Sequence, residues 1–265
     1  MKKVIFSHFV LLWAMILLSG CQNGSNPKVI AHRGASAYET ENTLAAVEKA
    51  IALNSDAVEV DIWRTADDSL IVFHDRHTTR LADDSLVVPE SSFDDLKALQ
   101  LKGGEQIPSL REVLEILPKN MEIFIEIKCC WEEGEAGNVF PMLSEMLHET
   151  GTTGRATIIS FNPEKLRDAR ESLPGVPLYW LTGQEKAPRK IIDQAMEVEA
   201  DGINVHYGIL SKELIDLAHE SGLGVYTWTV NDPEDAGELL RKYNLLGITT
   251  DRPDEIAKVI KKHTK

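Results

Sequence analysis

The chain has 265 residues, and its 42 acidic residues outnumber its 28 Lys and Arg to give a formal net charge of −14 at pH 7. This length suits one large core and matches a (β/α)8 barrel, which needs roughly 250 residues. So acidic a chain has no general field to attract nucleic acid or an anionic membrane surface. Any anionic ligand must therefore be held by local positive charge.

The amino-terminal residues are typical of an export signal. Two lysines precede an apolar run from Val4 to Leu18, which predicts a signal peptide over residues 1–20. An uncleaved membrane anchor is the alternative, because the run is near the lower limit for a span. The sequence LSGC resembles the lipobox of bacterial lipoproteins, which implies a lipid-modified Cys21 and a tether over residues 21–27. We expect an exported protein of the bacterial cell envelope that faces the periplasm and meets the membrane only through this anchor.

Strand-like apolar segments recur through the expected barrel domain, residues 28–265. There are eight of them, at residues 28–32, 57–63, 122–128, 156–161, 177–182, 202–207, 224–230 and 246–251. Segments with apolar residues at helical spacing lie between most of them. Strands that alternate with helices indicate a parallel sheet, and eight repeats favour closure into a TIM-type (β/α)8 barrel.

One further apolar segment, residues 70–75, interrupts this alternation. Only the segment TADDS separates it from the strand before it, which is too short for a parallel crossover. We therefore expect a small antiparallel hairpin at one end of the barrel. The polar residues 76–106, with a short helix at residues 91–100, are expected to form a small insertion on the same rim.

The segment VIAHRG places a histidine and an arginine where the first strand ends. Gly34 breaks the strand, so His32 and Arg33 stand at its carboxyl end. Proteins that alternate strands and helices tend to keep their chemistry at this end of the sheet. Both residues are therefore candidates for the functional site.

Two neighbouring strands carry acids on one face. Glu59 and Asp61 are two residues apart, as are Glu126 and Lys128, so each pair shares a side of its strand. Three converging carboxylates repel one another unless a cation lies among them, and oxygen ligands favour Mg²⁺ or Ca²⁺ over zinc. The alternative is an ion-pair cluster of the acids with Lys128 and Arg33, without metal.

Two other residues at strand ends are candidates. His74 ends the hairpin strand, and Asp75 after it either orients the ring or caps the turn. Together with His32, it supplies a pair of histidines that can act as acid and base on opposite sides of a phosphorus atom. Trp228, near the end of a late strand, is either core or a surface for the carbon skeleton of a polyol or head group.

Several short blocks, in order along the chain, resemble the glycerophosphodiester phosphodiesterases. They are HRG, ENT, VEVDIWRTADD, IVFHD, IPSLREVL, EIK, WTVND and TTDRP. The resemblance implies a TIM-type barrel that hydrolyses small-molecule glycerophosphodiesters to sn-glycerol 3-phosphate and an alcohol, using one divalent cation, Ca²⁺ or Mg²⁺.

The resemblance also implies roles for residues of the matching blocks. The acid and the base are His32 and His74, in an order left open, and the residues that contact the phosphate are Arg33 and Lys128. The metal ligands are Glu59, Asp61 and Glu126. The first loop is braced by Glu41 and Asn42 of the ENT block.

Two stretches depart from the family pattern. Leu81 and Ala82 stand where Thr-Thr is common, and Cys129 and Cys130 where a proline is frequent. We expect both stretches on loops near the site, where they bear on substrate preference. The adjacent cysteines favour free thiols over a strained disulfide. Three acids within residues 131–138 favour a cationic head group such as choline or ethanolamine.

Two other functions are weighed against hydrolysis of these diesters. The first is a phospholipase D-like or cyclising barrel phosphodiesterase acting on intact lipid; the acidic charge and the lack of a long apolar stretch after Lys28 weigh against it. The second is a non-catalytic glycerophosphodiester-binding lipoprotein, which would need an anion clamp but not two proton-transfer groups. Apart from the hint of a cationic head group in residues 131–138, the sequence does not determine the preferred head group, and it indicates no oligomeric state.

Overall fold

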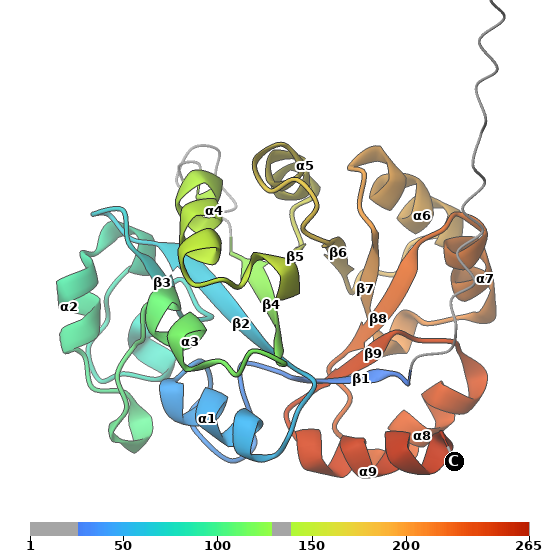
Figure 1. Ribbon diagram of the computed structural model, residues 1–265, viewed down its shortest axis with the longest axis horizontal. Helices are drawn as coiled ribbons and strands as arrows, with labels where there is room; N and C mark the ends of the chain where they lie inside the picture. The colour runs from blue at the N-terminus through green and yellow to red at the C-terminus, as the bar shows by residue number, and fades with distance from the viewer. Residues whose placement is uncertain (1–25, 129–138, 265) are drawn as a thin grey trace, which may run out of the picture.

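The computed structural model describes residues 26–128 and 139–264. Parallel strands run side by side in the order β1, β9, β8, β7, β6, β5, β4 and β2, and pairing of β1 with β2 closes them into the expected eight-stranded barrel (Figure 1). The strands are β1 Lys28–Ala31, β2 Ala57–Arg64, β4 Glu122–Ile127, β5 Ala156–Ser160, β6 Leu178–Thr182, β7 Gly202–His206, β8 Gly224–Trp228 and β9 Gly247–Thr250.

Helices surround the strands (Figure 1). They are α1 Leu44–Ala52, α3 Leu110–Ile116, α4 Phe140–Glu149, α5 Pro163–Ser172, α6 Pro188–Glu197, α7 Lys212–Glu220, α8 Pro233–Lys242 and α9 Pro253–His263. Local sequence sets several starts: the side chains of Asn162 and Asp232 accept backbone N–H groups of α5 and α8, and a proline follows each cap. In the part of the chain described, none of the helices has the length and apolar character needed to cross a membrane.

The hairpin and the insertion form a small unit beside the barrel. β3 Leu70–Val72 pairs antiparallel with the last residues of β2, as expected. The short helix is α2 Phe93–Ala98, capped by Ser92. The unit has its own core, made of Trp63, Ile71, Phe73, Leu81, Ala82, Val88, Leu96, Leu99, Leu101 and Ile107. The insertion is therefore a packed unit with an apolar core of its own, not an extended loop on the rim of the barrel.

The strands bury different side chains on their two faces. Val58, Val60 and Ile62 of β2 belong to the large core shared with the helices. Inside the barrel, an apolar cluster that includes Phe124 and Tyr226, whose ring centroids are 5.1 Å apart, fills the interior. Polar side chains gather instead toward the carboxyl ends of the strands. The alternation expected for β2 is thus observed, with its acids inside.

Several predicted features lie outside the described residues. These are the signal peptide over residues 1–20, most of the tether with Cys21, the two adjacent cysteines Cys129 and Cys130, and the acidic residues 131–138.

Gly34, directly after the HR pair, fits a space that no side chain can enter. Its φ is +81°, and a Cβ atom there would lie 2.6 Å from the backbone carbon of Ala46 in α1. We expect Gly34→Ala to lower the free energy of unfolding by roughly 3 kcal/mol or more. Urea unfolding of the wild type and the variant measures this loss of free energy. Gly175→Ala is the matched control, because its φ is +83° with nothing within 4 Å. Equal losses would contradict the role of the close approach.

Candidate active site

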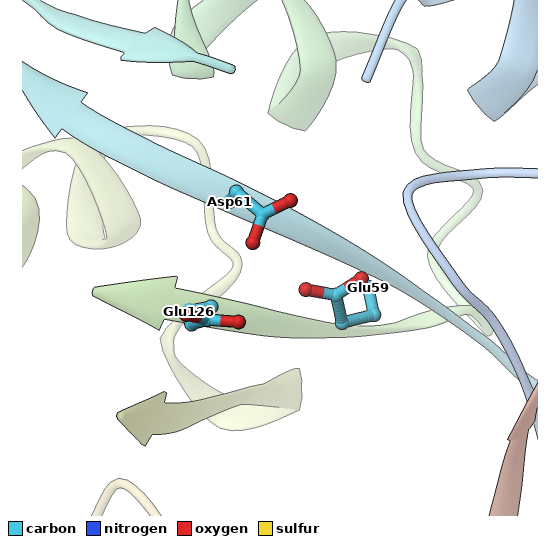
Figure 2. A group of neighbouring side chains, drawn as sticks. All are labelled: Glu59, Asp61 and Glu126. Atoms are coloured by element: carbon cyan, nitrogen blue, oxygen red, sulfur yellow. The ribbon is translucent and has the colours of Figure 1, made fainter. Parts of the chain in front are cut away.

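Three buried carboxylates converge inside the barrel. Glu59 and Asp61 extend from β2 and Glu126 from β4, where it pairs in register with Asp61 (Figure 2). Their exposed fractions are 3%, 1% and 8%. One oxygen from each lies within 4.8 Å of the others. The shared strand faces predicted from residue spacing therefore bring the acids together.

The charges within this acid cluster are incompletely compensated. Burial, followed by the charges of Asp61 and Glu126, raises the pKa of Glu59. Burial and Asp61 likewise raise the pKa of Glu126 to about 7, although Lys128 opposes them. In a self-contained network of ion pairs, the carboxylates would be stabilised in their charged form. The raised pKa values therefore indicate that Lys128 and Arg33 do not fully compensate the charges of the three acids.

Lys128 and Arg33 supply the positive charge next to the acids. The ammonium of Lys128 lies 2.9 Å from Asp61 Oδ1 and 2.6 Å from Glu126 Oε1. Arg33 donates its backbone N–H to Glu59 at 2.9 Å, and its Nε lies 3.4 Å from Asp61 Oδ2. Burial alone would raise the pKa of Asp61, but Lys128 and Arg33 outweigh burial and lower it. Asp61 therefore remains ionised.

The loop after β1 holds these groups in place. Asn42, which is buried, donates to Asp61 Oδ2 at 2.7 Å and accepts the backbone N–H of Asp61 at 3.3 Å. Glu41 accepts from Arg33 Nη1 at 2.7 Å. Arg33 and Asn42 have φ values of 53° and 57°, the left-handed region that non-glycine residues rarely adopt. These contacts fit the bracing implied for ENT.

Each candidate histidine is held by a carboxylate. His32 Nδ1 lies 2.6 Å from Asp251 Oδ1, and His74 Nδ1 lies 2.6 Å from Asp75 Oδ1. A neutral ring that donates from Nδ1 leaves its Nε2 lone pair for a substrate. Burial, helped by the charges of Lys128 and Arg33, lowers the pKa of His74, although the charge of Asp61 and the bond with Asp75 oppose it. This shift favours the neutral ring of His74.

A pocket of about 120 Å³ opens over this cluster. Its lining combines the polar groups with an apolar wall: His32, Arg33, Glu59, His74, Glu126, Ile159, Phe161, Leu181, Asn204, Trp228 and Thr249. Two predicted site residues do not line the pocket: Asp61, a member of the acid cluster, and Lys128, which pairs with it at 2.9 Å. The pocket therefore brings Glu59 and Glu126 together with both histidines in one lining.

Trp228 is both packed and part of the site. Its Nε1 donates to the backbone carbonyl of Asn204 at 3.1 Å, which fixes the ring. Phe161, 43% exposed, meets it edge to face with the ring centroids 5.5 Å apart. Trp228 is therefore packed and also lines the pocket, and its contact with the carbon skeleton of a polyol or head group stays a prediction.

Comparison with known proteins identifies the family. The profile of the glycerophosphoryl diester phosphodiesterase family matches residues 32–255. The chain belongs to this family. A glycerophosphodiester phosphodiesterase of Caldanaerobacter subterraneus subsp. tengcongensis is 30% identical over 247 residues, which cover 88% of this chain and 98% of the relative.

Solved structures of relatives share the fold. A phosphodiesterase from Oleispira antarctica, in complex with the product sn-glycerol 3-phosphate, gives a TM-score of 0.80 at 26% identity and covers 89% of this chain and 97% of that chain. A glycerophosphodiester phosphodiesterase from Parabacteroides distasonis gives 0.77 at 27% identity, over 91% and 99%.

One departure from the pattern of the family is explained by the insertion. Leu81 and Ala82 are buried in the separate core of the hairpin and insertion, and neither lines the pocket. Both residues lie outside the helices and strands, directly after Arg80, so they are on a loop as expected, but their side chains pack in the core of the insertion and not in the pocket. Apolar side chains at these two positions add to the packing of the insertion.

Sequence reasoning assigned no role to three residues at this site. Asp251 supports His32, Phe161 lines the pocket, and Arg80 bonds to Glu41. Asp251 lies in the TTDRP block, so the resemblance contained a signal for it. The partners of Phe161 and Arg80 depend on tertiary contacts.

Asp251 makes the stability of the fold depend on pH. Burial alone would raise its pKa, but bonds from His32, Asn231 and Ser36 and the charge of His32 lower it from 3.8 to about 2. A lowered pKa adds stability above the unfolded-state value, and this stability is lost as the pH falls toward 2. Between pH 5 and pH 3, we expect the free energy of unfolding to fall by about 1 kcal/mol less in Asp251→Asn than in the wild type. Urea titrations check this, and parallel pH profiles would contradict it.

Proposed function

We propose that this protein hydrolyses glycerophosphodiesters to sn-glycerol 3-phosphate and an alcohol with the help of a divalent cation. The observation that carries the proposal is the pocket itself, where two carboxylate-supported histidines face a cluster of three buried acids. The product complex of the Oleispira antarctica relative supports the same substrate class. Phosphoryl transfer relies mainly on positioning and on neutralising the phosphate oxygens, which such a site provides.

Arg33 and Lys128 are proposed to contact the phosphate. Arg33 lines the pocket, and Lys128 lies beside the acid cluster next to it. Burial alone would lower the pKa of Lys128, but Asp61 and Glu126 outweigh burial and raise it, so the ammonium stays charged. This local positive charge explains how an acidic protein can bind an anion.

The two histidines are proposed to divide the proton transfers. Among the described residues, the other side chains that donate to Asp251, the partner of His32, are the neutral groups of Ser36 and Asn231, so its charge can stabilise an imidazolium. Asp75, the partner of His74, shares its charge with Arg80. We therefore assign His32 as the acid that protonates the leaving oxygen and His74 as the base that removes a proton from the nucleophile.

Glu59, Asp61 and Glu126 are proposed to hold the cation. One carboxylate oxygen from each acid lies within 4.8 Å of the other two, and oxygen ligands of this kind are the ones that Ca²⁺ and Mg²⁺ prefer. When bound, such an ion would supply charge stabilisation to the phosphate oxygens.

The deciding experiment is release of sn-glycerol 3-phosphate by the purified domain from Gln22 onward. Glycerophosphocholine, glycerophosphoethanolamine and glycerophosphoglycerol are tested with chelator and after addition of Ca²⁺ or Mg²⁺. The proposal requires chelator-sensitive release that one of the ions restores. A folded protein that releases nothing from any diester would contradict it, and activity on dispersed phospholipid instead would favour the lipid-acting alternative.

We also propose export and lipid attachment at Cys21, with residues 1–20 as signal peptide and residues 21–27 as tether. The LSGC sequence supports this proposal. In a bacterial host, the wild type should incorporate labelled palmitate and sediment with the membranes, whereas Cys21→Ser should not be labelled. Equal labelling of both proteins would contradict it.

A further inference from the structure

Arg80 joins the insertion to the loop after β1. It ends a short 3-10 helix, Thr78–Arg80, in the segment that follows β3. Its Nη1 and Nη2 donate to the two oxygens of Glu41 at 2.8 and 2.7 Å, and its Nε donates to Asp75 Oδ2. A planar guanidinium is suited to such contacts, because its five N–H donors have a fixed fork geometry.

Both carboxylates held by Arg80 also hold a residue of the pocket. Glu41 Oε1 accepts from Arg33 Nη1 at 2.7 Å, and Asp75 Oδ1 lies 2.6 Å from His74 Nδ1. Arg80 is therefore connected to Arg33 through Glu41 and to His74 through Asp75. A single guanidinium links the two pocket residues, which come from different parts of the chain.

Arg80 also changes the electrostatics of the pocket, because its positive charge lies next to both carboxylates. Without it, Arg33 would be the remaining ion-pair partner of Glu41 within the described part of the chain, and the full charge of Glu41 would draw that guanidinium away from an anionic substrate. Asp75 would keep its contact with His74 but lose the opposing charge. Arg80 neutralises part of both carboxylates, so the positive charge of Arg33 remains available in the pocket.

We propose that Arg80 is a positioning residue for the hydrolysis proposed above, on which this inference rests. Its single guanidinium group holds both Glu41 and Asp75 in place, and these two carboxylates set the positions of Arg33 and His74 relative to the substrate. Small displacements of such groups can cost about 10²-fold in rate, even when the altered residue does not touch the substrate.

A purely structural role would have a different signature. The insertion has its own apolar core and further attachments, including the pair of Lys97 with Glu112 at 2.7 Å and the bond from Thr40 to the Lys102 carbonyl at 2.7 Å. The side chain of Arg80 is 43% exposed, and exposed ion pairs contribute little to folding stability. Loss of Arg80 should therefore affect activity much more than folding.

The test compares Arg80→Gln with Arg111→Gln. Arg111 is a matched control, because its side chain is also 43% exposed and pairs with a glutamate, Glu149, away from the pocket. With glycerophosphocholine and saturating Ca²⁺, we expect Arg80→Gln to lower kcat/KM by about 10- to 100-fold, through both a lower kcat and a higher KM. The midpoints of urea unfolding should match those of the control.

Two further variants separate positioning from charge alone. Arg80→Lys keeps the charge but loses the fork, so we expect it to remain close to Arg80→Gln. Guanidinium ions at non-denaturing concentration should restore part of the activity of Arg80→Ala, because the site is open to solvent. A merely structural residue would not respond in this way.

Three results would count against the inference. Equal activity of Arg80→Gln and Arg111→Gln, or a loss of activity that follows a loss of folded protein, would overturn it. Failure of guanidinium to restore any activity would overturn the positioning role as well. A wild type that releases sn-glycerol 3-phosphate from no diester would instead overturn the proposed function, so the two failures are distinguishable.

Discussion

Glu126→Gln should lower kcat/KM for glycerophosphocholine by about 10²- to 10³-fold while it raises the stability of the metal-free protein at pH 8. Burial and Asp61 raise the pKa of Glu126 to about 7, so its ionised form is unfavourable in the fold above that pH. Glutamine keeps the shape but removes the charge. Activity and stability should therefore change in opposite directions, as at a site shaped for binding rather than for folding.

The metal dependence of the stability completes this test. Ca²⁺ should raise the melting temperature of the wild type, because a ligand that binds only the folded state stabilises it, and should raise that of Glu126→Gln much less. Glu122→Gln is the control, since Glu122 lies at the other end of β4 and pairs with Lys28 at 2.7 Å. If neither Ca²⁺ nor Mg²⁺ shifts the wild type and Glu126→Gln is less stable in chelator, the acids form an ion-pair cluster instead.

His32→Ala and His74→Ala should each lower kcat by about 10²- to 10⁴-fold, the usual contribution of a positioned acid or base. Both rings line the pocket, and a carboxylate fixes the Nδ1 of each. His148→Ala is the control, because His148 is exposed in the last turn of α4. Circular dichroism of all three variants verifies that they are folded.

The leaving group decides which histidine is the acid. A p-nitrophenol ester of glycerol 3-phosphate needs no proton on its leaving oxygen, so His32→Ala should recover much of its activity with this substrate. His74→Ala should stay slow with both substrates, since the nucleophile still requires a base. The opposite pattern would reverse the two assignments, and full activity of either variant with glycerophosphocholine would remove that histidine from the mechanism.

The acidic composition and the expected anionic substrate are reconciled by burial. Lys128 is in contact with two carboxylates and Arg33 with three, through a backbone bond, a hydrogen bond and a 3.4 Å ion pair. In a site shielded from water, a few charges placed this closely act more strongly than the field of the distant surface. The net charge therefore limits binding to large polyanions but not to a small phosphodiester in the pocket.

The fold and the acid cluster were predictable because both depend on local periodicity. Alternation of apolar and polar residues with period two puts Glu59 and Asp61 on one face of β2 and Val60 on the other, wherever that strand lies. The same rule applies to Glu126 in β4. Because neighbouring parallel strands bring their carboxyl ends to one edge, the spacing alone brings these acids together.

The supports of the site follow only from the tertiary structure. His32 and Asp251 are 219 residues apart in the sequence, and they meet because the first strand, β1, pairs with the last strand, β9, when the barrel closes. Arg80 and Glu41 are 39 residues apart, and they meet because the insertion folds back over the first loop. Periodicity fixes which face a side chain occupies. The partner across the barrel is decided by closure and packing, which join segments that no local pattern relates.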